Sequence, residues 1–156
     1  MIEISIPGYR HLIFRHLVLD YNGTLAVDGA LLPGLKTALA HLAKDLEIHV
    51  LTADTFGEVR ARLDGIPCKV TVLPLDNQDR RKLDYVKKLG PENTVCIGNG
   101  RNDRLMLKEA ALGIAVILGE GASVETLVSA DVVCTEILSG LELLTKPLRL
   151  TATLRS

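Results

Sequence analysis

The sequence contains few aromatic residues and has no excess of charge of either sign. Phe, Tyr and Trp make up only 3% of its 156 residues, which disfavours a surface that stacks nucleic-acid bases. With 18 basic and 19 acidic residues the net charge is −1, so bulk charge does not create a nucleic-acid-binding face. We therefore expect no nucleic-acid partner.

Long apolar runs and paired cysteines are absent as well. The apolar runs fall short of the roughly 20 residues that a membrane span requires, and no basic segment followed by an apolar stretch marks a signal peptide. Cys68, Cys96 and Cys134 lie far apart without a C-x-x-C pair, which is typical of reduced thiols. These absences predict a soluble, cytoplasmic protein without a membrane partner.

The apolar residues that are present predict a compact α/β protein. Hydrophobic residues make up 47% of the chain, and no Pro/Gly/Ser-rich linker divides it, so we expect one domain over residues 1–156. Apolar runs typical of strands cover residues 2–6, 17–19, 48–51, 70–73, 94–97, 114–118 and 132–134. Segments with helical spacing lie between most of these runs.

The helical segments are defined by apolar stripes. These stripes are Leu35-Leu39-Leu42-Leu46, Val59-Leu63, Leu83-Val86-Leu89 and Leu105-Met106. Strands that are apolar throughout and alternate with helices predict a three-layer, Rossmann-like fold, with a mostly parallel sheet and helices on both faces. Residues 25–32 predict a small β-hairpin flap. The segment from Thr145 onward is predicted to be a tail or an edge segment.

Four polar signals follow the predicted strands. In chain order they are Asp20 with Asn22-Gly23-Thr24, then Thr52, then Lys82 near the start of a helix, and finally Gly98-Asn99-Gly100-Arg101-Asn102-Asp103. Because parallel strands bring their carboxyl ends to one edge of a sheet, we expect these pieces to converge on a single crevice.

This order of motifs resembles the haloacid dehalogenase (HAD) superfamily, and most of all the soluble relatives of the phosphorylation domain of P-type ATPases. In that superfamily the first motif reads D-x-D-G-T, or D-K-T-G-T in the ATPases, and the fourth reads G-D-G-x-N-D. This chain has DYNGT at residues 20–24 and GNGRND at residues 98–103. The resemblance covers residues 17–134 and implies a HAD-like form of the α/β fold.

The resemblance implies a Mg²⁺-dependent phosphatase or phosphotransferase that acts on a small phosphorylated substrate. Asp20 would attack phosphorus and become an aspartyl phosphate. The implied catalytic residues are Asp20, Asn22, Thr52 and Lys82, and the implied phosphate-binding residues are Gly23, Thr24, Thr52, Ala53 and Lys82. The implied Mg²⁺ ligands are Asp20, the backbone carbonyl of Asn22, Asn99 and Asp103.

Four of these residues also have a purely structural interpretation. A strand that ends at Asp20 and is followed by the pair Asn22-Gly23 is also typical of an ordinary turn, and Thr52 is also typical of a helix cap. Lys82 belongs to the charged run at 79–82, which by itself is typical of a solvated helix start. Asp103 fits a first-turn acid that interacts with the helix macrodipole.

Other polar residues near the motifs are assigned minor roles. Asn102 is expected to orient Asp103 or its neighbours, and Arg101 is expected to face solvent. The four histidines, His11, His16, His41 and His49, match no functional position, and no ligand-spaced partner is evident for any of them.

Two asparagines depart from the superfamily pattern. Asn22 stands where most phosphatases of the superfamily have the aspartate that serves as general acid and base, and an amide can do neither. Asn99 stands where the family usually has a metal-binding aspartate. The aspartyl phosphate is therefore expected to be hydrolysed slowly, with weaker Mg²⁺ binding. The alternative function is a catalytically weakened domain that binds phosphate, a nucleotide or a protein partner.

The spacing of the motifs leaves no room for a cap domain. Residues 25–46 fit a flap and one helix, and residues 55–80 fit a helix, a strand and turns. A site without a cap is open to solvent, which works against the exclusion of water that favours phosphoryl transfer. We therefore expect a homo-oligomer whose neighbouring subunit covers the site, or else a large substrate.

Overall fold

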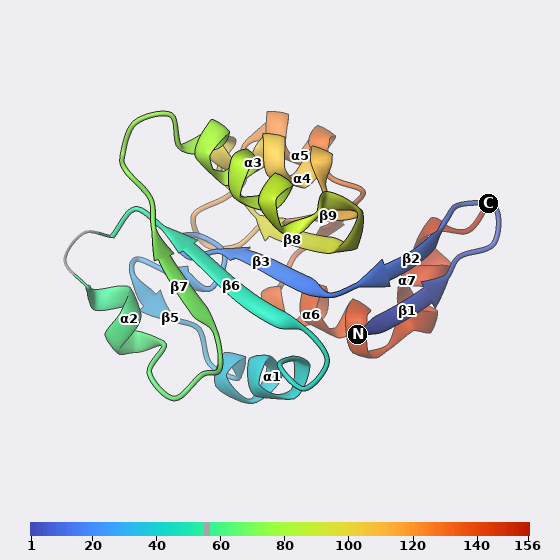
Figure 1. Cartoon of the computed structure of the whole chain (residues 1–156), viewed down its shortest axis with the longest axis horizontal. Coiled ribbons are helices and arrows are strands. Elements are labelled where there is room, and N and C mark those ends of the chain that lie inside the picture. Colours follow the sequence, from blue (N-terminus) through green and yellow to red (C-terminus); the bar gives the residue numbers. More distant parts are fainter. Residues whose placement is uncertain (55–56) are drawn as a thin grey trace.

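The computed structural model describes residues 1–54 and 57–156 and has a six-stranded parallel sheet at its centre (Figure 1). In spatial order the strands are β10 (Val132–Cys134), β9 (Leu112–Val116), β8 (Thr94–Gly98), β3 (His16–Asp20), β6 (Glu47–Thr52) and β7 (Lys69–Val72). Every neighbouring pair in this sheet runs parallel. The predicted α/β fold with a mostly parallel sheet is confirmed.

Helices cover both faces of the sheet, as predicted. One face packs against α3 (Gln78–Leu89), α4 (Arg104–Glu109) and α5 (Val124–Ser129), and the other packs against α1 (Leu35–Leu42), α2 (Glu58–Arg62) and α6 (Ile137–Thr145). The apolar side chains of β3 contribute to the cores on both faces of the sheet, because successive side chains of a strand point to opposite faces. Val18 belongs to the core under α3 and α4, whereas Leu17 and Leu19 belong to the core above α1 and α6.

The strand order reverses direction around β3. The chain places β6 and then β7 on one side of β3, and later places β8, β9 and β10 on the other side. The carboxyl ends of β3 and β8 therefore flank the switch point, where ligands bind in open α/β sheets. Short 3₁₀ turns, η1 (Pro91–Asn93) and η2 (Arg101–Asp103), precede and follow β8.

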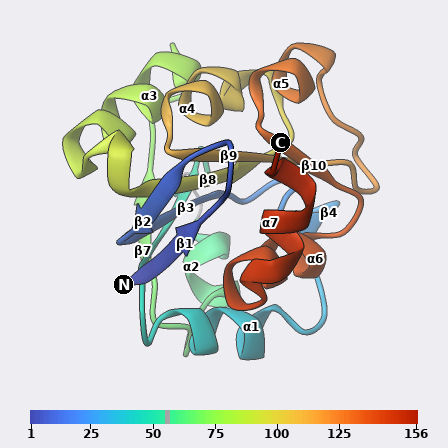
Figure 2. The ribbon, with the colours of Figure 1, turned by 90° about the vertical axis from the view of Figure 1, so that its right-hand side faces the viewer.

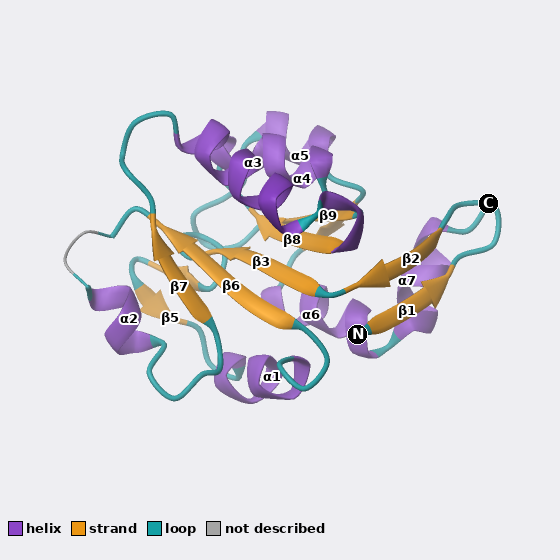
Figure 3. Cartoon of the chain, viewed as in Figure 1, coloured by secondary structure: helices purple, strands orange, loops and turns teal. Residues whose placement is uncertain are grey.

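The predicted flap is present as a small hairpin close to the end of β3. Its strands are β4 (Ala26–Val27) and β5 (Ala30–Leu31), which pair antiparallel. The turn residues Asp28 and Gly29 have φ values of +51° and +77°, as a two-residue hairpin turn requires. In the part of the chain that the structure describes, no cap domain interrupts the fold between β3 and α3 (Figure 3).

A second hairpin, at the end of the molecule away from the flap, was only half predicted. β1 (Ile2–Ser5) was expected, but β2 (His11–Phe14) was not. Only Arg15 separates β2 from β3, so the sequence shows no turn that would mark two strands. The hairpin packs against α7 (Pro147–Leu154) (Figure 2), whose Leu150 is fully buried. The prediction of a tail or edge segment after Thr145 was therefore wrong.

Two predicted helical stripes also differ in detail. Leu46 is buried but lies beyond the end of α1, in the turn before β6. On α3 the fully buried positions are Lys82 and Val86, while Leu83 and Leu89 are half-buried. An apolar stripe was thus an incomplete guide to α3, because its buried face includes a charged residue.

Candidate active site

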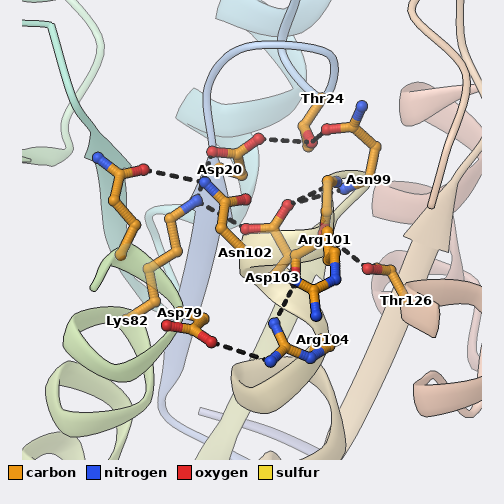
Figure 4. A network of polar contacts seen from close by, with 12 residues as sticks. Asp20, Thr24, Asp79, Lys82, Asn99, Arg101, Asn102, Asp103, Arg104 and Thr126 are labelled. Carbon is orange, nitrogen blue, oxygen red and sulfur yellow. Dashed lines mark hydrogen bonds and ion pairs between the residues drawn. The ribbon is translucent and has the colours of Figure 1, made fainter. Parts of the chain in front are cut away.

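Three charged side chains from distant parts of the chain meet at the switch point (Figure 4). The Lys82 ammonium donates to Oδ1 of Asp20 and to Oδ1 of Asp103, both at 2.7 Å. Asp20 ends β3, Lys82 lies in the first turns of α3, and Asp103 ends η2. All three are buried, and Lys82 is only 1% exposed. Lys82 therefore does not belong to a solvated helix start.

The loop after β8 folds around the Asp103 carboxylate. Its Oδ2 accepts hydrogen bonds from the backbone N–H groups of Asn99, at 3.0 Å, and Gly100, at 2.9 Å. A side chain at Gly98 would place a Cβ 2.5 Å from this carboxylate, so the close approach requires glycine. Backbone donors on one oxygen and Lys82 on the other fix the position of Asp103.

Both ends of the Asn99 amide are used: one contacts the first motif, and the other contacts the loop after β9. Its Oδ1 accepts from Thr24 Oγ1 at 3.3 Å, and its Nδ2 donates to the carbonyl of Gly121 at 3.0 Å. Gly23 has a φ of +79°, and a Cβ there would lie 2.2 Å from Asn99 Nδ2. A carboxylate at position 99 could not donate to Gly121, so the amide has a structural role here that aspartate would lack.

The charges at this site perturb one another strongly. Burial, and then the negative charge of Asp103, raise the pKa of Asp20 to about 7, although Lys82 opposes this shift. The two carboxylates raise the pKa of Lys82 above its ordinary value despite burial, which by itself lowers it. When Asp20 is ionised, two carboxylates and one ammonium carry a net charge of −1, so the buried cluster then contains more negative than positive charge.

The raised pKa of Asp20 predicts how stability depends on pH. Between about pH 4 and pH 7 the folded protein binds a proton on Asp20 that the unfolded chain has released. Stability of the metal-free protein should therefore fall as pH rises through this window, by at most about 1.4 kcal/mol per pH unit from this group, and level off above it. Urea unfolding at several pH values with a chelator measures the slope.

The matched variant for this measurement is Asp20→Asn, which removes the titrating group. Subtracting its unfolding free energy from that of the unmodified protein isolates Asp20 from all other titrating residues. A difference that does not change between pH 4 and pH 7 would contradict the expected shift.

Thr52, Ala53 and Asn22 lie at or just beyond the carboxyl ends of the paired strands β6 and β3. Thr52 ends β6, one residue beyond the register partner of Asp20, and its Oγ1 accepts from the backbone N–H of Asp54 at 3.1 Å. This bond uses the oxygen as an acceptor, so the hydroxyl retains a hydrogen to donate. The exposed Asn22 and the half-buried Ala53 line a cavity of about 350 Å³.

Several neighbours of the site behave differently from the sequence prediction or were missed by it. Asn102 does not hydrogen-bond Asp103, because its amide donates across to Gln78 of α3 at 2.9 Å. Arg101 is exposed, as predicted, and pairs with Glu125. The buried Thr126, which the sequence did not single out, donates to the carbonyl of Gly100 at 2.6 Å. This contact joins residues 26 positions apart, and the residues around Thr126 do not predict it.

The cluster has the chemistry of a site for a hard divalent cation. Carboxylate, amide and carbonyl oxygens are the ligands that Mg²⁺ prefers, and the excess negative charge is what such an ion would compensate. Oδ2 of Asp20 accepts a weak hydrogen bond from Thr24 Oγ1 at 3.4 Å. The predicted ligands thus fit Mg²⁺ by charge and donor type, and their individual roles stay predictions.

The fold and this arrangement of side chains define a class of protein. No protein-family model matches the chain. Its fold is that of the HAD superfamily in the form without a cap. One solved structure with this fold is the 3-deoxy-D-manno-octulosonate 8-phosphate phosphatase of Moraxella catarrhalis, in complex with magnesium, phosphate and KDO. It is 18% identical over 85% of this chain and 86% of its own, with a TM-score of 0.71.

The chain belongs to the same family as Uncharacterized protein MJ0073 of Methanocaldococcus jannaschii, with 47% identity over 74 residues, or 47% of this chain and 80% of that protein. A zinc-transporting PIB-type ATPase in its E2.Pi state is 27% identical over 79% of this chain and 20% of its own, with a TM-score of 0.63. Within the described residues, no helix of this protein is long and apolar enough to cross a bilayer.

Proposed function

We propose that this protein is a Mg²⁺-dependent phosphatase or phosphotransferase that forms an aspartyl phosphate on Asp20 and hydrolyses it slowly. The main observation behind this proposal is the buried Lys82 ammonium, which lies 2.7 Å from both the Asp20 and the Asp103 carboxylates at the switch point of the sheet. Burying three charges is costly, and a purely structural core has no need for them. The likeness in fold to a magnesium-bound phosphatase supports the same conclusion.

The proposed first step is in-line attack by Asp20 on phosphorus. Lys82 holds Oδ1, so Oδ2 forms the new bond to phosphorus while the bond to the leaving oxygen breaks. Lys82, the Thr52 hydroxyl and backbone N–H groups of Gly23, Thr24 and Ala53 would stabilise the phosphoryl oxygens. When bound by Asp20, the Asn22 carbonyl, Asn99 and Asp103, Mg²⁺ would add positive charge against these oxygens.

The proposed second step is attack by water, which returns the Asp20 carboxylate and releases inorganic phosphate. Both steps need proton transfer: the leaving oxygen must gain a proton, and the attacking water must lose one. Asn22 faces the adjoining cavity, where a general acid and base would lie, but its amide cannot exchange a proton. Solvent must then supply the proton in the first step and accept it in the second, which makes both steps slow.

Replacing Asn22 by aspartate is expected to raise turnover of a simple phosphate ester by about 100-fold, at the lower end of what general acid–base catalysis contributes. The position is exposed, so the new carboxylate carries little desolvation cost. Steady-state hydrolysis of a chromogenic ester measures the gain. Asn22→Ser supplies no acid and is the matched control; equal rates for the two variants would contradict the assigned role.

The direct test of the proposal is covalent labelling. The protein is incubated with Mg²⁺ and acetyl phosphate, and intact mass and peptide mapping locate any phosphoryl group. We expect the label on Asp20, sensitive to hydroxylamine as an acyl phosphate is. Binding of beryllium fluoride without any label under these conditions would favour the alternative, a weakened domain that only binds phosphate. The structural use of the Asn99 amide is the observation that favours that alternative.

A further inference from the structure

Two histidines and a glutamate meet near the amino ends of β3 and β6, whereas Asp20 lies at the carboxyl end of β3. His16 opens β3, and its register partner on the neighbouring strand β6 is Glu47. His49 lies two residues beyond Glu47, on the same face of β6. His16 Nδ1 lies 3.2 Å from His49 Nε2, and Glu47 Oε2 lies 4.0 Å and 3.8 Å from these two nitrogens. The sequence suggested no such partner, because only strand pairing brings His16 beside β6.

The buried histidine of this cluster is held in a defined orientation. His49 is 1% exposed, and its Nδ1 lies 2.9 Å from the Tyr85 hydroxyl of α3. When Nδ1 donates to Tyr85, the lone pair of Nε2 points toward His16. A metal ion binds a neutral imidazole through such a lone pair. A second residue that orients a histidine in this way is typical of metal sites.

The spacing of the three atoms approaches that of ligands around one ion. Tetrahedral zinc with bonds of about 2.0–2.1 Å places its ligands about 3.4 Å apart. The two nitrogens are already at this separation, and Glu47 would move closer by roughly half an ångström. The Glu47 side chain is 58% exposed and free to do so once it leaves Lys69, which is 3.0 Å away and 68% exposed. An exposed ion pair of this kind contributes little stability.

We propose that His16, His49 and Glu47 bind a first-row transition-metal dication such as Zn²⁺, at a site separate from the proposed Mg²⁺ site. Two imidazole nitrogens and one carboxylate select such an ion, whereas the oxygen-rich cluster at Asp20 suits a hard cation. His16 and Glu47 also line an open cavity of about 410 Å³, which gives an ion access from solvent and leaves room for a water ligand.

Metal titration of the untagged protein tests this site independently of activity. The protein is stripped with a chelator, desalted and kept in excess Mg²⁺ to occupy hard-cation sites. Co²⁺ is then added while its visible absorption is followed, and Zn²⁺ is added as a competitor. We expect one equivalent of Co²⁺ to bind with a tetrahedral-type spectrum and to be displaced by Zn²⁺. An absence of binding would overturn the proposal.

Variants assign the bound ion to these residues. His16→Gln should weaken Co²⁺ binding by at least about 100-fold, and Tyr85→Phe, which removes only the orienting hydroxyl, by about 10-fold. Glu47→Gln, at an exposed position, should weaken it as well and serves if His16→Gln does not fold. The exposed His41 provides the control, since His41→Gln should bind as the unmodified protein does. Unchanged affinity in both His16→Gln and Glu47→Gln would place the ion elsewhere and overturn the proposal.

Discussion

Asp20→Asn should abolish phosphoryl transfer while leaving the protein folded and at least as stable. An amide at this position cannot attack phosphorus, and losing a nucleophile typically costs on the order of 10⁴-fold or more in rate. The same change removes one of two carboxylates that share a single ammonium, so the buried cluster goes from a net charge of −1 to neutral. Since burial and Asp103 raise the pKa of Asp20, losing its charge relieves repulsion.

Two measurements separate loss of chemistry from loss of structure. Hydrolysis and phosphoenzyme formation report the first, and urea unfolding without metal at pH 8 reports the second. Asp84→Asn, an exposed change on α3, is the matched control and should leave both unaltered. Residual activity of Asp20→Asn near that of the unmodified protein would refute the proposed nucleophile. A large loss of stability would refute the account of the buried charges.

Lys82→Met should be the most destabilising single change at the site. Methionine fills a similar volume but leaves the Asp20 and Asp103 carboxylates buried without their shared cation. Removing one partner of a buried ionic cluster typically costs about 3–5 kcal/mol. Activity should also be lost, because the phosphoryl oxygens lose a positive charge. Urea unfolding and phosphatase assays with the exposed Lys87→Met as control measure both effects.

A second substitution shows whether charge is the cause. If uncompensated carboxylates destabilise Lys82→Met, adding Asp20→Asn should recover part of the lost stability, and millimolar Mg²⁺ should stabilise the single variant more than the unmodified protein. Equal destabilisation in the single and double variants would point instead to poor packing of the methionine.

The core of the fold and the order of the motifs were predictable because they depend on local patterns. Apolar runs located the six strands of the central sheet, and polar residues after β3, β6 and β8 indicated a common crevice. Hairpin-forming residues indicated the flap at Asp28-Gly29. Each of these signals is contained in a few consecutive residues.

Features that depend on contacts between distant segments were not predictable. β2 runs into β3 without a turn, and α7 is stabilised by packing against the β1–β2 hairpin rather than by a strong pattern of its own. The burial of Lys82 depends on carboxylates 62 and 21 residues away, so its charged neighbours suggested the opposite. The bond between Asn102 and Gln78 requires the approach of α3 to the loop after β8.

The reversal of strand order around β3 has a consequence for dividing the chain. Gly65 is exposed in the connection between α2 and β7, so a break there would disturb little packing. The first fragment would carry Asp20 and Thr52, and the second would carry Lys82 and Asp103. The second fragment supplies β7, which pairs with β6, and β8 to β10, of which β8 pairs with β3. It must therefore pair with the first fragment along both of its strand edges. Recovery of the proposed phosphatase activity on mixing would then report assembly of the whole sheet, which makes this chain a candidate for a split reporter.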